Sequence, residues 1–285
     1  MAIKDILVHL DASARSEVRL AVAADLARRH GAHLTALFVI EQLSAALFYG
    51  DAGGFVDVQL VEEMMDKIRE RAMVEARRVE QGFHDRVRRD GIEGEWRLVE
   101  GAAADTVALH ARYADLAVVG QHDPDDTTLS SAAQVAASTL LASGRPVLIV
   151  PYIGAIATLG QTVLVGWKSS REAARAINDA LPLLRQARSV TVLAINPEQG
   201  IGGDGDVPAA DIALHLARHG VKAAAAHTVA AEISAGDALL NHADEIGADL
   251  IVAGGYGHAR LREFVFGGVT RTLLTTMTVP VFLSH

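Results

Sequence analysis

The chain repeats itself, and this repetition limits its possible folds more than any other feature of the sequence. "ADLAVVGQHD" (residues 114–123) resembles "ADLIVAGGYG" (residues 248–257). The segments before and after these stretches also align, and the first copy is longer in its middle. We therefore expect two similarly folded domains, residues 1–153 and residues 154–285.

Each copy contains the same series of elements, in which short apolar runs alternate with helical segments. Fully apolar runs of this length between helices are typical of parallel strands buried on both faces. Five strands per copy predict two repeated, doubly wound α/β domains, each with a five-stranded parallel sheet. The expected strands are residues 6–10, 34–40, 96–99, 116–119 and 147–150, then 163–166, 190–195, 221–228, 250–253 and 281–283.

The extra segment of the first copy is expected to be mostly one long helix, because its apolar residues recur at steps of three or four. The stretch before it, residues 43–57, is expected to be a loop able to cover a strand edge. A short linker, residues 151–161, predicts that the two copies pack together as an internal pseudo-dimer. The apolar positions of the helix are Leu60, Val61, Met64, Met65, Ile68, Ala72, Ala76, Val79, Phe83 and Val87.

Charge and composition exclude several classes of protein. The net charge of −9 argues against a broad nucleic-acid surface, which needs clustered Lys and Arg. No apolar run approaches the roughly 20 residues that span a bilayer, so we expect no membrane partner and a cytoplasmic location. The absence of cysteine excludes disulfides and thiolate metal sites. The pair His215 and His219 lacks a third ligand at a suitable spacing, and no metal site is expected.

Glycines gather after the fourth strand of the second copy. The strand ends at Gly254, and Gly257, Gly267 and Gly268 lead into a helix whose first turn contains Thr270. The start of a helix favours an anion, and glycines let a phosphate approach the backbone. Plain turn glycines are the alternative interpretation. Because the first copy lacks most of these glycines, we expect that the fold alone does not require them and that a nucleotide phosphate does.

The spacing Gly-x2-Gly-x9-Gly resembles the G-x2-G-x9-G-[ST] signature of the universal stress proteins, and the order of elements in both copies is similar to that family. The resemblance covers nearly the whole chain and indicates a tandem member. It implies a sheet of strand order 3-2-1-4-5 and, as in many members, ATP binding. It assigns ribose and phosphate contacts to Gly254, Gly257, Gly267, Gly268, Val269 and Thr270, a contact at the strand end to Ala253, and an adenine contact to Ile195.

Two positions of the second copy depart from the family pattern. Gly268 stands where the family has Ser or Thr, so one hydroxyl donor is lost. Lys168 stands where the family has an Asp that contacts the nucleoside, and lysine accepts no hydrogen bond. Either Lys168 reaches a phosphate instead, or the affinity falls.

The first copy keeps the family's Asp but has lost motif glycines, whereas the second copy keeps the glycines and has lost the Asp. Asp11 occupies the family's Asp position and Val39 the adenine-facing position, although Asp11 is equally well placed to cap a helix opening near Ser13. Asp123 and Ala133, however, replace two motif glycines, and the acidic loop would repel a triphosphate. We therefore expect no ATP in the first copy.

These observations favour a stress-response protein that binds ATP or a related adenine nucleotide in its second copy, with Mg²⁺ as an optional companion ion. A nucleotide-independent interaction module is one alternative. A slow adenine-nucleotide hydrolase is another, but only His258 and Glu263 offer a general base near the motif. We therefore do not expect an enzyme. A homodimer of the whole chain is left open.

Overall fold

The computed structural model describes residues 2–41, 58–125, 132–197, 207–256 and 268–285. Every strand predicted from the apolar runs is found, at bounds close to those expected. The strands are β1 (Asp5–Leu10), β2 (His33–Glu41), β3 (Gly94–Gly101), β4 (Leu116–Gly120), β5 (Val147–Val150), β6 (Thr162–Trp167), β7 (Ser189–Ile195), β8 (Ala223–Thr228), β9 (Leu250–Gly254) and β10 (Val281–Ser284). The helices are α1 (Ser16–His30), α2 (Val58–Asp90), α3 (Ala103–Ala111), α4 (Ala132–Ala142), α5 (Arg171–Leu184), α6 (Ala210–Arg218), α7 (Ala235–Glu245) and α8 (Gly268–Thr276).

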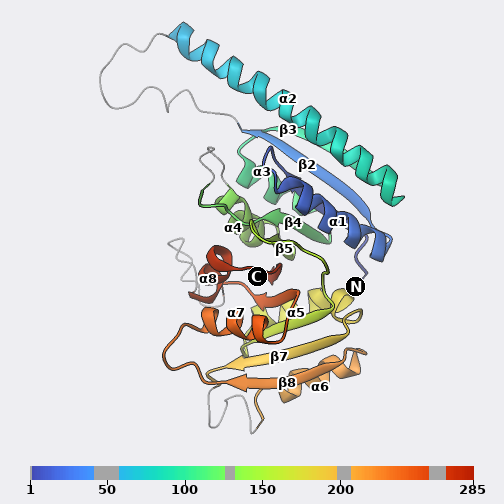
Figure 1. The fold of residues 1–285 in the computed structure, drawn as a ribbon, viewed down its shortest axis with the longest axis vertical. Helices are drawn as coiled ribbons and strands as arrows, with labels where there is room; N and C mark the ends of the chain where they lie inside the picture. The colour runs from blue at the N-terminus through green and yellow to red at the C-terminus, as the bar shows by residue number, and fades with distance from the viewer. Residues whose placement is uncertain (1, 42–57, 126–131, 198–206, 257–267) are drawn as a thin grey trace.

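All ten strands belong to one sheet, in the order β3-β2-β1-β4-β5-β10-β9-β6-β7-β8. The first half of the molecule (β1 to β5) therefore has the expected order 3-2-1-4-5, and the second half (β6 to β10) repeats it in the opposite direction. Pairing is parallel inside each half, and β5 pairs with β10 antiparallel, with Phe282 opposite Leu148. Figure 1 shows the two halves stacked along the long axis of the molecule. The predicted packing of the two copies thus takes the form of a continuous sheet.

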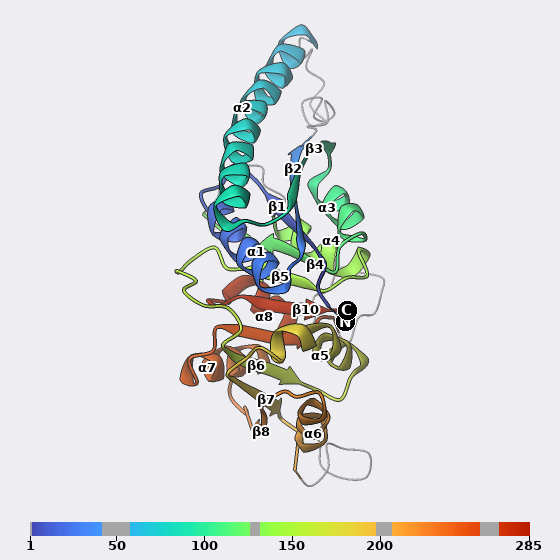
Figure 2. The same cartoon turned by 90° about the vertical axis from the view of Figure 1, so that its right-hand side faces the viewer.

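The hydrophobic core forms two layers, one on each face of this sheet. Helices α1, α2, α5 and α6 pack on one face, and α3, α4, α7 and α8 on the other. Figure 2 shows the arrangement at one end, where α2 and α3 lie on opposite sides of β2 and β3. Neighbouring strand residues alternate between the layers, as Ile6 and Leu7 do in β1. Because each layer contains residues of both halves, neither half has a core entirely of its own.

The predicted long helix is confirmed as α2, but only part of its apolar face is covered. Val79 and Phe83 are buried, and the ring of Phe83 packs against Trp96 of β3 with 6.0 Å between ring centroids. Nearer its start, Leu60 and Met64 are exposed by 56% and 43%. In Figures 1 and 2 this part of α2 extends beyond the sheet. The expected loop at residues 43–57 lies outside the described residues.

Among the described residues, no helix is both long enough and apolar enough to cross a membrane.

Candidate functional site

The strand ends of the second half bring several predicted site residues to one edge of the sheet. In the parallel register, Gly166 of β6 lies beside Ala253 of β9. Lys168, just after β6, is exposed, Ala253 is buried, and Ile195 at the end of β7 is half-buried. In open α/β sheets, ligands bind beyond these carboxyl ends, where the strand order reverses. This edge is therefore the candidate site.

The two ends of the glycine motif meet at this edge. The backbone N–H of Tyr256, two residues beyond β9, donates to Oγ1 of Thr270 in the first turn of α8, at 3.2 Å. Thr270 is buried, and its hydroxyl links the end of β9 to the first turn of α8. Gly268 begins α8 as predicted and is exposed, and Val269 is half-buried. Gly257 and Gly267 lie outside the described residues.

Gly254 has a role in packing that the sequence did not reveal. A Cβ atom added there would lie 2.5 Å from the backbone nitrogen of Ala173, in the first turn of α5. Only glycine permits the start of α5 to pack this closely on the end of β9. The expectation that the fold does not require the motif glycines is therefore wrong for Gly254. Gly120, at the end of β4, is its counterpart in the first half.

In the first half, a buried arginine occupies the corresponding place. A Cβ added to Gly120 would collide with Nη1 of Arg19, which lies directly over it. Arg19 is 4% exposed, and its Nη2 lies 2.5 Å from Oδ2 of Asp11. Its Nε donates to the backbone oxygen of His9 at 3.1 Å, and Nη2 donates to Oγ of Ser16 at 2.9 Å. The Asp11 carboxylate that the family resemblance assigns to a nucleoside is thus paired within the protein.

The sequence allowed Asp11 to cap the following helix, but Asp11 does not cap α1. The helix begins at Ser16, and the residue at its N-cap position, Arg15, makes no capping bond through its side chain. Asp11 instead accepts a hydrogen bond from the backbone N–H of Ser13 at 2.9 Å, which turns the chain between β1 and α1. The carboxylate therefore orders the turn and neutralises Arg19.

The electrostatics of this cluster follow from burial and from the ion pair. Burial would raise the pKa of Asp11, but the guanidinium of Arg19, together with His9 and the hydrogen bonds from Ser13, outweighs burial and holds the pKa well below its usual value. Burial lowers the pKa of His9 to about 4, against the opposing charge of Asp11 and with a further lowering by Arg19. At neutral pH the cluster thus contains a charged pair beside a neutral imidazole.

Sequence reasoning missed Arg19, although one signal was present. It lies on α1 among residues that are otherwise small or apolar on their buried face, such as Leu20 and Ala23. A lone arginine within an apolar helix face usually needs a buried anionic partner. The pattern does not show that the partner is Asp11 or that the pair fills the end of β4.

Among the described residues, no group of three or more His, Cys, Asp or Glu is arranged to hold a metal ion. The ring centroids of His215, in α6, and His219, directly after it, are 4.7 Å apart, and the rings are tilted by 58° to each other. His258 and Glu263, the candidate general bases, lie outside the described part of the chain. The fold and this edge define a tandem, doubly wound α/β protein with its candidate ligand site at the strand ends of the second half.

Comparison with known proteins gives the family. The sequence model of the Universal stress protein family matches residues 2–151 and again residues 160–285. The chain therefore belongs to the universal stress protein family and contains two copies of its domain. No curated protein matches the sequence.

Some solved structures share this fold over nearly the whole chain, and others match about half of it. A universal stress protein from Archaeoglobus fulgidus DSM 4304 matches with a TM-score of 0.71 at 19% identity, over 98% of this chain and 95% of its own. A protein of unknown function from Pseudomonas aeruginosa PAO1 matches with a TM-score of 0.59 at 14% identity, over 99% of this chain and 92% of its own. A universal stress protein solved in complex with cAMP matches 53% of this chain and 98% of its own, at 24% identity and a TM-score of 0.37.

Proposed function

We propose that the second half binds ATP or a related adenine nucleotide and that the protein acts in stress response through this binding. The observation that carries the proposal is the hydrogen bond between Tyr256 and Thr270, which joins the end of β9 to the start of α8. Gly254 and Gly268, from the two ends of the glycine motif, thereby lie at one edge of the sheet. Anions are stabilised at such a helix start by the outward N–H groups and by the helix dipole.

Lys168 and Ile195 supply the remaining features of the proposed site. Lys168 follows β6, next to β9 in the sheet, and its exposed ammonium would contribute positive charge for a phosphate. Ile195, at the end of β7, offers a half-buried apolar surface on the far side of β6, suited to an adenine ring. Mg²⁺ would accompany a triphosphate through the phosphate oxygens, since the protein is proposed to contribute no ligand set of its own.

The first half is proposed to bind no nucleotide. Arg19 fills the place over Gly120, and the carboxylate of Asp11 is committed to it. A nucleotide would have to separate the buried guanidinium of Arg19 from the partly exposed carboxylate of Asp11, and leaving a buried charge uncompensated is strongly unfavourable. One adenine nucleotide per chain is therefore the expected stoichiometry. The division into domains at residues 153 and 154 and the cytoplasmic location stay predictions.

The substitution Gly268→Asp tests the proposal with little risk to the fold. Gly268 is exposed, and a Cβ added there meets no atom within 4 Å. The new carboxylate would repel the phosphates, so we expect ATP affinity to fall by about tenfold or more, equivalent to about 1.4 kcal/mol. Isothermal titration of the full chain with Mg·ATP measures it. Substitution of Gly254 is uninformative, because the clash with α5 would itself disturb the fold.

Gly82→Asp is the matched control. Gly82 is exposed on α2, and a Cβ added there also meets no atom within 4 Å, so the same charge is introduced far from the candidate site. The control is expected to keep the wild-type affinity and a stoichiometry of one. Undetectable ATP binding by the unmodified chain, or equal affinities for Gly268→Asp and wild type, would contradict the proposal.

A nucleotide-independent interaction module is the second candidate, and two observations favour it. Packing against α5 explains Gly254 without a ligand, and the hydroxyl of Thr270 already accepts a hydrogen bond from the chain itself. Under this alternative, Gly268→Asp would leave protection in a cellular stress assay intact. The nucleotide-binding proposal predicts that protection is lost together with ATP affinity.

A further inference from the structure

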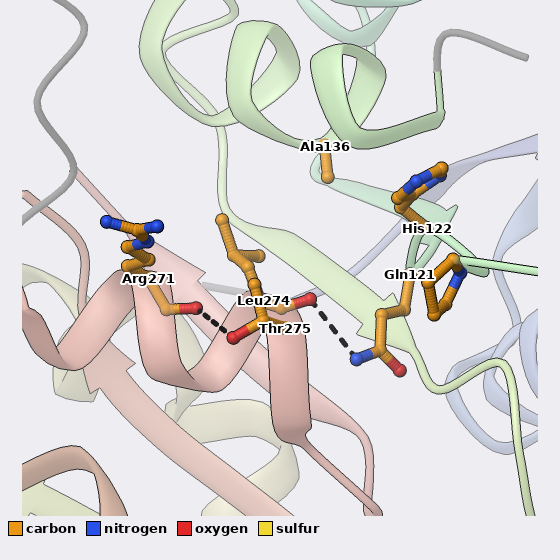
Figure 3. A pocket seen from close by; sticks show the side chains of 7 residues that line it. Gln121, His122, Ala136, Arg271, Leu274 and Thr275 are labelled. Atoms are coloured by element: carbon orange, nitrogen blue, oxygen red, sulfur yellow. Dashed lines mark hydrogen bonds between the residues drawn. The ribbon is translucent and has the colours of Figure 1, made fainter.

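A cavity of about 230 Å³ opens where the two halves meet, against the side of α8 that carries Arg271, Leu274 and Thr275. Figure 3 shows that the end of β4 and helix α4 of the first half face helix α8 of the second half across it. Both halves are therefore needed to form it. Its lining includes Gln121, His122, Ala136, Arg271, Leu274 and Thr275.

The floor of the cavity is held in place by Gln121, which is buried. Its Nε2 donates to the backbone oxygen of Leu274 in α8, at 3.1 Å, and its Oε1 accepts from the backbone N–H of Tyr152, at 3.1 Å. The amide thereby joins β4, the linker between the halves and the last turn of α8. A buried amide with both ends bonded is rigid, so the cavity is formed before any ligand arrives.

The walls are apolar, the α8 side of the cavity carries the cation of Arg271, and on the other side Pro124 lies between the carboxylates of Asp123 and Asp125. Ala136 is buried, Leu274 is half-buried, and Thr275 uses its hydroxyl to donate to the backbone oxygen of Arg271 at 2.9 Å. Figure 3 shows the side chains of Arg271 and His122 on opposite sides of Leu274. Within the described residues, the exposed guanidinium of Arg271 makes no ion pair.

The counterpart of this place, on the other side of the junction, is filled by the protein itself. In the sequence repeat, Gly255, Tyr256 and Leu140 correspond to Gln121, His122 and Leu274. Cδ2 of Leu140 lies 2.8 Å from where a Cβ of Gly255 would be, and both Leu140 and Tyr256 are buried. Burial raises the pKa of the Tyr256 phenol to about 12, so its packed side chain is neutral. Packed side chains thus fill this side of the junction, whereas a cavity remains on the side of Gln121 and Leu274.

We propose that this cavity binds a small aromatic carboxylate, with its ring between Ala136 and Leu274 and its carboxylate at Arg271. A dry apolar cavity of roughly 150 Å³ accepts benzene, so the space here suits one aromatic ring with a short acidic substituent. It is smaller than the roughly 300–1,000 Å³ typical of sites for drug-sized ligands. A guanidinium at an apolar rim selects a carboxylate over a neutral group of the same shape.

The test is a titration of the ¹⁵N-labelled full chain with benzoate, followed by NMR. We expect saturable shifts of the Gln121 side-chain amide and of the backbone amides of Ala136 and Leu274. Benzyl alcohol, a neutral analogue, should bind roughly fivefold more weakly, which is the upper range for an exposed charge. Arg271→Gln should weaken benzoate to the same extent, while Arg218→Gln, which removes an exposed arginine on α6, should not.

Two further variants test the location. Ala136→Leu places a larger apolar side chain in the cavity, and Thr275→Trp covers its mouth from an exposed position and so spares the core. Each is expected to weaken benzoate at least tenfold in protein that melts as the wild type does. The proposal is overturned by the absence of saturable shifts at these amides, by wild-type binding in the variant that remains folded, or by equal affinity for benzoate and benzyl alcohol.

Discussion

At the scale of single residues, the pair of Asp11 and Arg19 shows how the two halves have diverged. Both residues lie where a ligand would otherwise approach, and the ion pair occupies that place with the chain's own charges. The corresponding positions in the second half are Lys168 and Ala176, which offer a single cation and a small side chain. The strand ends are thus alike in backbone but differ in charge, since the first carries a neutral ion pair and the second a single cation.

Asp11→Asn should destabilise the protein because it leaves the guanidinium of Arg19 buried without an anion. Arg19 is 4% exposed, and removal of one partner of a buried pair costs about 3 kcal/mol or more. The matched control is Asp85→Asn, whose carboxylate pairs with Arg88 where the side chains are 59% and 76% exposed, and it should cost less than about 1 kcal/mol. Urea denaturation at pH 7 measures both free energies of unfolding. Equal losses would mean that the Asp11 pair contributes no more than a surface pair.

His9 should make the protein less stable as the pH falls from 6.5 towards 4. Its pKa is lowered from 6.5 to about 4 in the folded state, so below pH 6.5 the unfolded chain binds a proton that the folded protein does not. Stability is therefore fully present above pH 6.5 and lost as the pH falls towards 4, by about 3 kcal/mol from this group. Denaturation of His9→Asn at pH 7 and pH 4.5 should show a smaller pH dependence than wild type. An unchanged dependence would contradict the assignment.

At the scale of elements, α2 is longer than the surface that supports it. Its second part packs through Phe83 on Trp96 and Gly94. Its first part presents Leu60, Met64 and Ile68 to solvent, and Arg69 ties the middle of the helix to Glu100 at the end of β3, at 2.6 Å. The helix is therefore stabilised mainly from one end.

The two ends of α2 should respond differently to truncation of an apolar side chain. Phe83→Ala removes a fully buried ring and should cost about 3–5 kcal/mol. Met64→Ala removes a side chain that is 43% exposed and should change stability by less than about 0.5 kcal/mol. Chemical denaturation of the two variants gives the comparison. A large cost for Met64→Ala would contradict the conclusion that α2 is stabilised mainly from its second part.

The elements were predictable from the sequence because each one follows from local patterning. Apolar runs predicted the strands, and apolar residues that recur every three or four positions predicted α2. The contacts between elements were not predictable in this way. Nothing local shows that α5 packs on Gly254, that Arg19 reaches Asp11 and Gly120, or that Gln121 bonds to α8 in the other half. The contacts at Gly254, Gly120 and Leu274 join residues far apart in the sequence, and the pairing of Arg19 with Asp11 depends on how the chain turns between β1 and α1.

At the scale of the whole molecule, the antiparallel pairing of β5 and β10 turns two repeats into one sheet. Val147 lies opposite Leu283, and Ile149 lies opposite Val281, with all four side chains buried. Both layers of the core cross this junction. Separation of the halves would expose two buried strand edges, which are sites for aggregation.

The protein should consequently unfold in a single cooperative transition, and the chain contains a means to test this. It has two tryptophans, Trp96 in the first half and Trp167 in the second. In the variants Trp96→Phe and Trp167→Phe, the remaining tryptophan reports one half alone, and the two denaturation midpoints should coincide. Adding Phe83→Ala, which truncates the core of the first half, should lower the midpoint seen by Trp167 as well. Two separate transitions would show that the junction does not couple the halves. The same would follow if Phe83→Ala left the denaturation midpoint reported by Trp167 unchanged.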